Sequence, residues 1–242
     1  EEDTIVVGGM LEHVEFAGVH SGDAAMVQPP HTLSRKTIDT MRKYTHAMAR
    51  ELEVTGLMNV QYAVKDEVVY VLEVNPRASR TIPFVSKTIG VPLAKMAARL
   101  MVGKTLADLG LVDDLDVAGV FVKTPVFPFV RFPGVDTILG PEMKSTGEVM
   151  GVDKHFRGAL AKALTASSLT IPPKSAVLLS ISDRDKPEVS SLVETLVIKG
   201  GCTLFATEGT AETIKDIGVP VTMITKKLSE GHPNVVDIIN EG

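Results

Sequence analysis

Five polar residues that lie close together in the sequence could bind a metal ion and phosphate groups: Gln61, Glu73, Asn75, Arg77 and Arg80. Mg²⁺ accepts oxygen ligands from a few protein groups when substrate phosphates complete its coordination shell, and the first three residues carry amide and carboxylate oxygens. The planar, permanently charged guanidinium groups of the other two suit phosphate oxygens. This combination predicts a phosphoryl-transfer site.

Two short segments must position these side chains. Leu57–Val64 and Val68–Val74 are rich in β-branched and aromatic residues, and the polar residues between them favour a turn, so an antiparallel hairpin is predicted. An odd-length loop from Asp66 to Val68 would oppose Gln61 to Glu73 on one face of the hairpin. A two-residue loop would instead set the Gln61 amide against an aliphatic side chain, so the odd-length loop is preferred.

Strand alternation then assigns the faces of the hairpin. On the first strand Gln61 shares a face with Asn59, and on the second strand one face is expected to carry Val69, Val71, Glu73 and Asn75. Any one of the polar residues is also compatible with a solvated or capping role, and Asn followed by Pro is an ordinary turn signal. Their concentration on one face of an apolar hairpin favours a binding site.

Composition restricts the class of protein. The chain has 242 residues, 44% of them hydrophobic, which is enough for one or two domains with real cores. A net charge of −5 and a pI near 5.7 argue against a nucleic-acid partner. Cys202 is the only cysteine, which excludes an intrachain disulfide and fits a reducing compartment. The sequence contains no apolar run long enough to span a membrane, and its N-terminus lacks the pattern of a secretion signal. A cytoplasmic protein without a membrane partner is therefore expected.

Before the hairpin, the glycine-punctuated segment Gly18–Asp23 predicts a loop that could approach a ligand closely. A helix is predicted from about Arg35 to Val54, capped by Ser34 or Thr32. After the hairpin, an apolar strand is predicted at Val117–Val122, followed by a proline-rich irregular excursion. Both ends of the sequence suggest a piece of a longer protein.

A second unit is predicted from Val152 onward. Its strands and helices alternate, which indicates a small parallel sheet with crossover helices. Ligands bind beyond the carboxyl ends of such strands, and there the segment Thr207–Thr210 opens a helix that could receive an anion. Lys186 and Lys226 could add positive charge. Taken alone this signal is weak, because threonine is a common helix cap.

The spacing Q-x11-E-x-N-P-R, which ends at Arg77, resembles the metal-binding end of ATP-grasp enzymes. The segment EVNPRASRTIPFVSK and the following GVPLAKMAARLM are similar to the large-chain family of carbamoyl-phosphate synthetase, and the form SRT-x-PFVSK resembles its second, carbamate-phosphorylating half. Further along, FPGVD, LGPEM and STGEVMG continue this pattern. The segments LLSISDRDK, ATEGT and EGHPN resemble the methylglyoxal-synthase-like allosteric domain of the same family. The resemblance covers essentially the whole sequence.

This resemblance implies an α/β protein of two parts. Residues 1–151 are expected to form the C-terminal lobe of the second ATP-grasp unit, an α+β structure with an antiparallel sheet. Residues 152–242 are expected to form a parallel-sheet, Rossmann-like domain of the methylglyoxal-synthase type, truncated at its C-terminus.

The implied activity is that of a glutamine-hydrolysing carbamoyl-phosphate synthetase. Such enzymes phosphorylate carbamate with ATP, and overall make carbamoyl phosphate from bicarbonate, glutamine-derived ammonia and two ATP for pyrimidine and arginine biosynthesis. The implied cofactors are Mg²⁺ or Mn²⁺, with ATP as substrate and K⁺ as a further cation. The implied partners are a glutamine amidotransferase small chain and further subunits of an oligomer. On its own the chain is expected to be inactive.

The resemblance also implies roles for single residues. Arg77 and Arg80 would stabilise the transferring phosphoryl group, and Gln61, Glu73 and Asn75 would bind the metal. The ATP-binding set is His20, Ser21, Gln61 and Glu73, and the phosphate of a UMP or IMP effector would lie near Lys186, Thr207, Thr210 and Lys226. Glu15 and Asp23 match acidic positions of an ornithine pocket, but Thr124 stands where ornithine-activated relatives carry Glu, which removes one partner of an ornithine ammonium group.

Two alternatives remain open. The motif E-x-N-P-R is widely shared, so the chain could belong to another ATP-grasp carboxylase or ligase; the SRTIPFVSK continuation and the attached second domain argue against this. The chain could also be a non-catalytic nucleotide-binding regulatory module that uses only its second domain.

Overall fold

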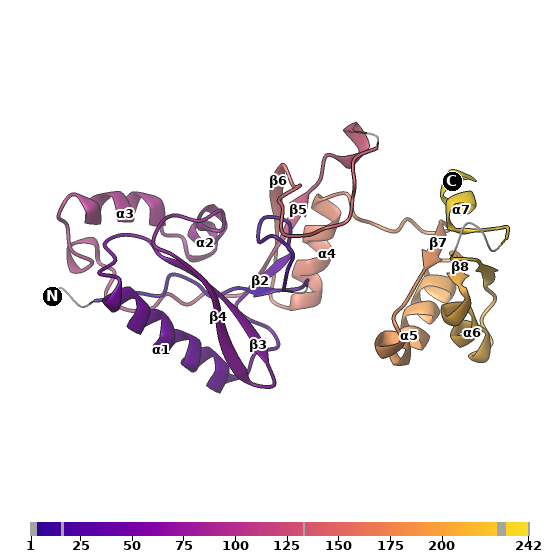
Figure 1. The fold of residues 1–242 in the computed structure, drawn as a ribbon, viewed down its shortest axis with the longest axis horizontal. Helices are drawn as coiled ribbons and strands as arrows, with labels where there is room; N and C mark the ends of the chain where they lie inside the picture. The colour runs from indigo at the N-terminus through magenta and orange to yellow at the C-terminus, as the bar shows by residue number, and fades with distance from the viewer. Residues whose placement is uncertain (1–3, 16, 133, 227–230, 242) are drawn as a thin grey trace. The chain divides into compact units, whose positions relative to one another are not determined.

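The computed structural model describes residues 4–15, 17–132, 134–226 and 231–241, and it divides into two compact units, Glu1–Leu169 and Thr170–Gly242 (Figure 1). Each unit has its own sheets and its own buried core. Among the described residues, no helix is both long and apolar enough to cross a membrane.

The first unit contains a four-stranded antiparallel sheet in the order β1-β2-β5-β6. The strands are β1 (Glu12–His13), β2 (Met26–Gln28), β5 (Val120–Val126) and β6 (Gly147–Asp153). Helix α4 (Phe156–Ala166) packs on β5 and β6, and the core between them contains Val27, Val122, Ala159 and Ala163 (Figure 1). Small residues on α4 allow this helix to approach the sheet closely.

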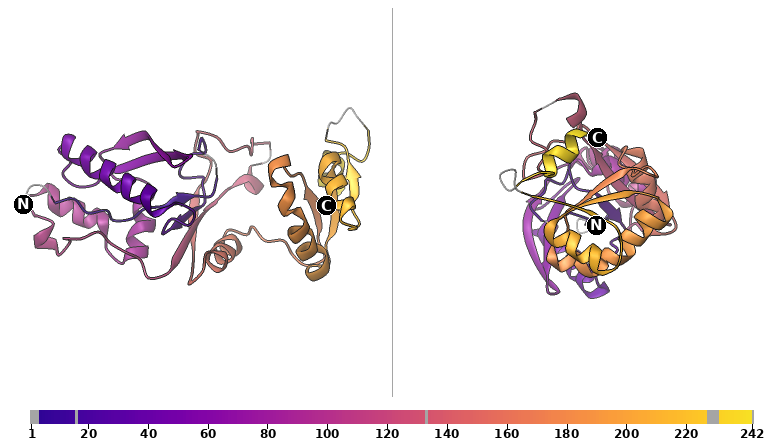
Figure 2. Two further views of the ribbon diagram at one scale, coloured as in Figure 1. Left: turned by 90° about the horizontal axis from the view of Figure 1, so that it is seen from below. Right: turned by 90° about the vertical axis from the view of Figure 1, so that its right-hand side faces the viewer.

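The hairpin predicted from the sequence forms a separate two-stranded sheet, β3 (Asn59–Lys65) and β4 (Val68–Asn75). Helix α1 (Arg35–Glu51) lies alongside it (Figure 2), and the Tyr62 hydroxyl contacts the Thr45 hydroxyl at 2.7 Å and the Met41 carbonyl at 3.2 Å. The Ser34 hydroxyl accepts a hydrogen bond from the Thr37 amide at 3.2 Å, which confirms the predicted N-cap.

The rest of the first unit is helical or irregular. Helices α2 (Ile82–Ile89) and α3 (Leu93–Met101) follow the hairpin, and short 3₁₀ turns lie at Ala107–Leu109 and Phe129–Arg131. Strand β5 continues through Pro125, so the irregular segment begins later than the sequence predicted. The predicted helix at residues 35–54 ends at Glu51.

The second unit is built around a parallel sheet in the order β7-β8-β9, as predicted. Its strands are β7 (Ala176–Leu179), β8 (Thr203–Thr207) and β9 (Thr222–Ile224). The helical segments are Asp183–Glu188 (3₁₀), α5 (Val189–Glu194), Thr195–Lys199 (π), α6 (Glu208–Asp216) and α7 (Val235–Glu241).

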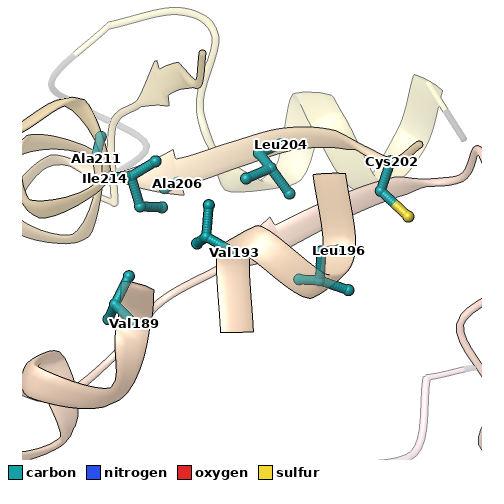
Figure 3. Packing of buried hydrophobic residues seen from close by; sticks show 8 residues of the cluster. All are labelled: Val189, Val193, Leu196, Cys202, Leu204, Ala206, Ala211 and Ile214. Carbon is teal, nitrogen blue, oxygen red and sulfur yellow. The ribbon is translucent and has the colours of Figure 1, made fainter. Parts of the chain in front are cut away.

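The core of the second unit lies between its sheet and the helices that connect the strands. Figure 3 shows Val193 pointing toward the strand that carries Leu204 and Ala206, with Ala211 and Ile214 supplied by α6, and Leu196 belongs to the same cluster. Cys202 is a free cysteine buried at the edge of this cluster.

The boundary between the units differs from the sequence-based one. The structure divides the chain after Leu169, whereas the sequence placed the division after Gly151. The reason is helix α4, which the sequence assigned to the second unit but which packs on β5 and β6 of the first.

Candidate functional site

The hairpin brings the predicted metal ligands together. Gln61 lies opposite Glu73, and Asn59 lies opposite Asn75, as the prediction required. Cross-strand partners share a face of the sheet, so the Gln61 and Glu73 side chains emerge on the same side of the hairpin.

The turn that produces this register was predicted wrongly. It contains two residues, Asp66 and Glu67, with φ values of 51° and 63°, the positive values that a type I′ hairpin turn requires. A two-residue turn alone would oppose Gln61 to Leu72. The register shifts between Gln61 and Tyr62, where Leu72 is an extra residue on β4, and this β-bulge restores the opposition of Gln61 to Glu73.

The same bulge changes the faces of β4. Tyr62 lies opposite Val71, and Val64 lies opposite Val69. These valines therefore share the face of Tyr62, which turns toward α1, and the prediction that they share a face with Glu73 is wrong. The polar end of the hairpin is thereby separated from its helix-facing apolar side.

Hydrogen bonds join the predicted ligands to one another and to Arg77. The Asn75 Nδ2 group donates to Glu73 Oε1, and Arg77 Nη2 donates to Asn75 Oδ1 at 3.3 Å. The Arg77 guanidinium also donates to the Ala78 carbonyl at 3.0 Å. An amide oxygen has two lone pairs, so Asn75 Oδ1 can accept from Arg77 and still bind a cation.

The donor set fits Mg²⁺ better than a soft metal. It offers one carboxylate and two amide oxygens, and hard oxygen ligands of this kind suit Mg²⁺ or Mn²⁺ whose remaining positions are taken by phosphates and water. Across the described residues, no group of three or more His, Cys, Asp and Glu side chains could hold a metal. The hairpin offers three protein oxygens, so the remaining positions of a six-coordinate cation there would be filled by phosphate oxygens and water.

The two predicted phosphate-binding arginines lie in the loop between β4 and α2. Both side chains are exposed, and the Arg77 amide donates to the Asn75 carbonyl at 2.8 Å, which holds the loop against the end of β4. The Ser79 and Thr81 hydroxyls are 2.8 Å apart just before α2 begins. Arg77 contacts the metal-ligand group, and Arg80 lies three residues farther along the same loop.

The predicted nucleotide-binding loop contains His20 and Ser21. The Asp23 and Ala24 amides donate to the His20 carbonyl at 2.8 and 3.1 Å, and the His20 amide donates to the Gly140 carbonyl at 2.8 Å. The Gly22 amide donates to His20 Nδ1 at 3.0 Å. Because Nδ1 is the acceptor in this contact, the neutral imidazole carries its proton on Nε2, where it can donate to a ligand oxygen.

A buried lysine that the sequence reasoning missed lies behind this loop. The Lys123 ammonium is 3.3 Å from the carbonyl oxygens of both Ser21 and Gly22, and 3.9 Å from Glu148 Oε2. Burial lowers the pKa of Lys123, whereas the nearby carboxylates oppose the shift. The available signal was a single lysine inside the apolar run Val120–Val126.

Glu15 and Asp23, the residues predicted for an ornithine pocket, make internal contacts. Asp23 is fully buried, and its two oxygens accept from the Lys144 and Ser145 amides at 2.7 and 2.8 Å. Burial acts to raise the pKa of Asp23, but these hydrogen bonds outweigh it and hold the pKa below its ordinary value. Glu15 accepts from the Ala25 amide at 2.6 Å, and burial raises its pKa.

Thr124 lies on the opposite face of β5 from Lys123, because side chains alternate along a strand. Its buried hydroxyl donates to the Ala163 carbonyl of α4 at 3.0 Å. The structure therefore directs position 124 toward the helix, and the residue that faces Glu15 and Asp23 is Lys123.

The second unit has a cavity of about 390 Å³ at the carboxyl ends of its strands. It is lined by Leu178, Ser180, Thr207, Lys226, Val235 and Val236. Two of the four predicted effector residues, Thr207 and Lys226, thus line one cavity. The Thr207 hydroxyl contacts Ser180 Oγ at 3.4 Å at the start of α6.

The other two effector residues lie beside this cavity. The Lys186 ammonium pairs with Asp183 at 2.6 Å, and a Cβ atom built on Gly209 would be 3.1 Å from it, which places the ammonium over the first turn of α6. Thr210 is only 1% exposed, and its hydroxyl accepts from the Ile181 amide at 3.0 Å. Its side chain therefore joins α6 to the end of β7 instead of lining the cavity.

In comparisons with known proteins, the two units match two different family models. Residues 1–109 match a family model described as carbamoyl-phosphate synthase L chain, ATP binding domain, and residues 188–242 match one described as MGS-like domain. The carbamoyl phosphate synthase large chain of Pasteurella multocida is 51% identical over 238 residues, which cover 98% of this chain and 22% of that protein. The large chain's C-terminal section from Methanocaldococcus jannaschii is 46% identical over 253 residues, covering 99% of this chain and 40% of the relative.

Among solved structures, the biotin carboxylase domain of a single-chain bacterial carboxylase matches with a TM-score of 0.51 and 17% identity, over 69% of this chain and 43% of that one. This likeness concerns the fold alone, and it confirms the predicted α/β class with an antiparallel ATP-grasp lobe. The chain spans about a fifth of the length of large-chain relatives such as the Pasteurella protein. On these matches the chain belongs to the family of carbamoyl phosphate synthase large chains and carries an MGS-like domain in its second unit.

Proposed function

We propose that the first unit supplies the metal- and phosphate-binding hairpin for ATP-dependent phosphorylation of carbamate to carbamoyl phosphate. The observation that carries this proposal is the opposition of Gln61 to Glu73 across the hairpin. Asn75 is hydrogen-bonded to Glu73, and Arg77 is hydrogen-bonded to Asn75. Phosphoryl transfer requires mainly positioning and neutralisation of negative charge, and a cation with adjacent guanidinium groups provides both.

Each residue has a defined role in this proposal. Glu73, Gln61 and Asn75 hold Mg²⁺ or Mn²⁺ against the phosphates, and the cation neutralises their charge. Arg77 and Arg80 contact the transferring phosphoryl group from the adjoining loop. His20 donates through Nε2 and Ser21 through its hydroxyl to the nucleotide phosphates, which is supported by the acceptor role of His20 Nδ1.

The proposal extends to the whole enzyme. The relatives are named as carbamoyl phosphate synthase large chains. In a glutamine-hydrolysing enzyme of this kind, a small chain would supply ammonia from glutamine, and bicarbonate and two ATP would be consumed in the cytoplasm for pyrimidine and arginine synthesis. K⁺ and assembly into an oligomer belong to the same proposal.

The test uses the 242-residue chain with Mn²⁺ and inorganic tripolyphosphate as the probe. Paramagnetic Mn²⁺ is expected to broaden the side-chain amide NMR signals of Gln61 and Asn75 only when tripolyphosphate is present. A Glu73→Gln substitution is expected to weaken Mn²⁺ binding by about tenfold or more, because it removes the one carboxylate. Glu51→Gln, an exposed position at the end of α1, is the matched control. Equal broadening in the wild type and in Glu73→Gln would contradict the proposal.

We also infer that the cavity of the second unit binds the phosphate of a nucleoside monophosphate such as UMP or IMP. Support comes from Thr207 and Lys226 in its wall and from the Lys186 ammonium over the first turn of α6, where helix amides and positive charge favour an anion. Its apolar residues Leu178 and Val235 suit the non-phosphate part of such a ligand.

Calorimetric titration of UMP and IMP tests this second proposal. Thr207→Ala is expected to abolish or strongly weaken binding, whereas Thr203→Ala, at the exposed opposite end of the same strand, is expected to leave it unchanged. If neither nucleotide binds the wild-type chain, or if both variants bind as the wild type does, the cavity is not an effector site.

A further inference from the structure

Lys123 is the largest fully buried side chain among the described residues, with 1% of its surface exposed. Removing an ammonium group from water is costly unless polar partners surround it. An apolar side chain of the same length would avoid this cost, so the buried charge points to a role for the ammonium in the contacts it makes. The partners of the ammonium show what that is.

The ammonium makes two of its contacts with main-chain carbonyls of a single loop. Ser21 O and Gly22 O each lie 3.3 Å from Nζ, more than a hundred residues away in sequence. The nearby carboxylates of Glu148, Glu15 and Asp23 favour the charged form of the group. The shortest contacts of the ammonium, at 3.3 Å, are those with the carbonyls of the loop, and the ion pair with Glu148 is longer at 3.9 Å.

Other contacts act on the same loop from the same side. The Ser145 hydroxyl donates to the Gly22 carbonyl at 3.1 Å, and the Asp23 carboxylate accepts from the Lys144 and Ser145 amides. A Cβ atom on Gly22 would lie 2.8 Å from Met143 Sδ and 3.1 Å from His20 Nδ1, so a side chain at this position would have to displace one of these two side chains. The carbonyls of the loop are thus directed into the molecule.

This arrangement decides which groups of the loop remain for a ligand. The carbonyls of His20, Ser21 and Gly22 all have internal partners, and the Gly22 amide occupies His20 Nδ1. In the part of the chain that the structure describes, the donors of this loop without an internal partner are His20 Nε2–H and the amide and hydroxyl of Ser21. A loop whose acceptors face inward and whose donors are left for a ligand is suited to an anion.

We propose that Lys123 is a positioning residue for phosphate binding: its buried ammonium holds the Ser21 and Gly22 carbonyls inward and so presents the His20 and Ser21 donors to the ligand. The proposal rests on the proposed function of this loop as a nucleotide-phosphate site. Lys123 itself does not touch the ligand. It acts through the conformation of residues 20–23.

Lys123→Met is the informative substitution, because methionine nearly matches the length of lysine and has no charge. In the 242-residue chain, amide hydrogen exchange is expected to become at least about tenfold faster at Gly22 and Asp23, since charged hydrogen bonds to the loop are lost. Exchange at Val122 and Ala159 in the adjoining core is expected to stay close to its wild-type rate. Uniform acceleration through the unit, or no change in the loop, would show that Lys123 only fills the core.

The binding arm uses Mg²⁺ and inorganic tripolyphosphate, followed by the His20 Hε1 NMR signal. The wild-type chain is expected to show a saturable shift of this signal, and Lys123→Met is expected to bind at least about tenfold more weakly. Lys162→Met, which removes a lysine that pairs with Asp153 at the surface, is the control and is expected to bind as the wild type does. Wild-type affinity in Lys123→Met would overturn the proposal.

The hydrogen-exchange and binding experiments test the positioning role of Lys123 and the phosphate-binding role of the loop separately. If the wild-type chain does not shift the His20 signal with tripolyphosphate, the phosphate role of the loop fails, while the exchange data still decide whether Lys123 orders the loop. If Lys123→Met does not fold, Lys123→Arg replaces it. The bulkier guanidinium is expected to displace the two carbonyls and to accelerate exchange at Gly22 and Asp23 selectively, and unchanged exchange there would contradict the proposal.

Discussion

A single carboxylate ties the end of β6 to helix α4. Asp153 accepts from Lys162 Nζ at 2.7 Å and from the His155 amide at 3.1 Å, and it lies against Gly158, where a Cβ atom would come within 2.5 Å of its carboxyl carbon. The hydrogen bond from Lys162, followed by that from the His155 amide, lowers the pKa of Asp153 from 3.8 to about 2. One side chain thus joins a strand end to the first turns of the helix that covers it.

This contact predicts a defined acid sensitivity. Because the folded-state pKa is depressed, the stabilisation is fully present above pH 3.8 and is lost as the pH falls toward 2. Asp153→Asn is expected to lower the melting temperature at pH 5 and to reduce its fall between pH 4 and pH 2. Thermal unfolding followed by circular dichroism measures both, with Asp39→Asn on α1 as a control for general charge effects. Parallel curves for the wild type and Asp153→Asn would contradict the assignment.

At the scale of elements, the packing of α4 on the sheet depends on a glycine, Gly151, in β6. A Cβ atom on Gly151 of β6 would lie 2.0 Å from the Ala159 carbonyl oxygen and 2.6 Å from the Ala163 amide nitrogen. The strand and the helix backbone are therefore in direct contact, and the fully buried Ala159 and Ala163 complete this close approach. Backbone cannot move aside as a flexible side chain can.

Gly151→Ala is accordingly expected to destabilise the first unit by about 2 kcal/mol or more, as overpacking against rigid neighbours does. Urea unfolding measures the free energy. Gly147→Ala is a matched control in the same strand, because no atom lies within 4 Å of its built Cβ, and it is expected to change stability by less than about 0.5 kcal/mol. Equal effects of the two substitutions would show that the helix can withdraw from the sheet.

The elements also show how far sequence reasoning reaches. The Ser34 cap and the opposition of Gln61 to Glu73 follow from local patterns, and both were predicted correctly. The two-residue turn was missed because Asp66 and Glu67 adopt positive φ without any glycine. The contacts of Lys123 and the inward position of Thr210 depend on partners far away in the chain, which no local pattern indicates.

At the scale of the whole molecule, each unit has a buried core of its own. The core of the second unit is formed by Val189, Val193, Leu204 and their neighbours, and that of the first by Val27, Val122 and the alanines of α4. Separate cores in one chain are the usual mark of separate folding domains.

The two units are therefore expected to unfold as two cooperative transitions. Residues 1–169 and 170–242, produced separately, are each expected to reproduce one of the two transitions of the full chain in differential scanning calorimetry. A boundary after residue 151 would remove α4 from the first unit, so a 1–151 chain is expected to be much less stable than 1–169. A cooperative 1–151 chain as stable as 1–169 would place the domain boundary where the sequence alone suggested.

The bulge at Leu72 and the two-residue turn at Asp66–Glu67 compensate each other in length. A hairpin with one more residue in its turn would oppose Gln61 to Glu73 without any bulge. Leu72 itself has no cross-strand partner, so its deletion would leave Lys65 opposite Val68 and Gln61 opposite Glu73. A slip of one residue elsewhere in the pairing would move the carboxylate to the face opposite the amide. Position 72 is thus a place where the length of β4 can change by one residue without separating Gln61 from Glu73.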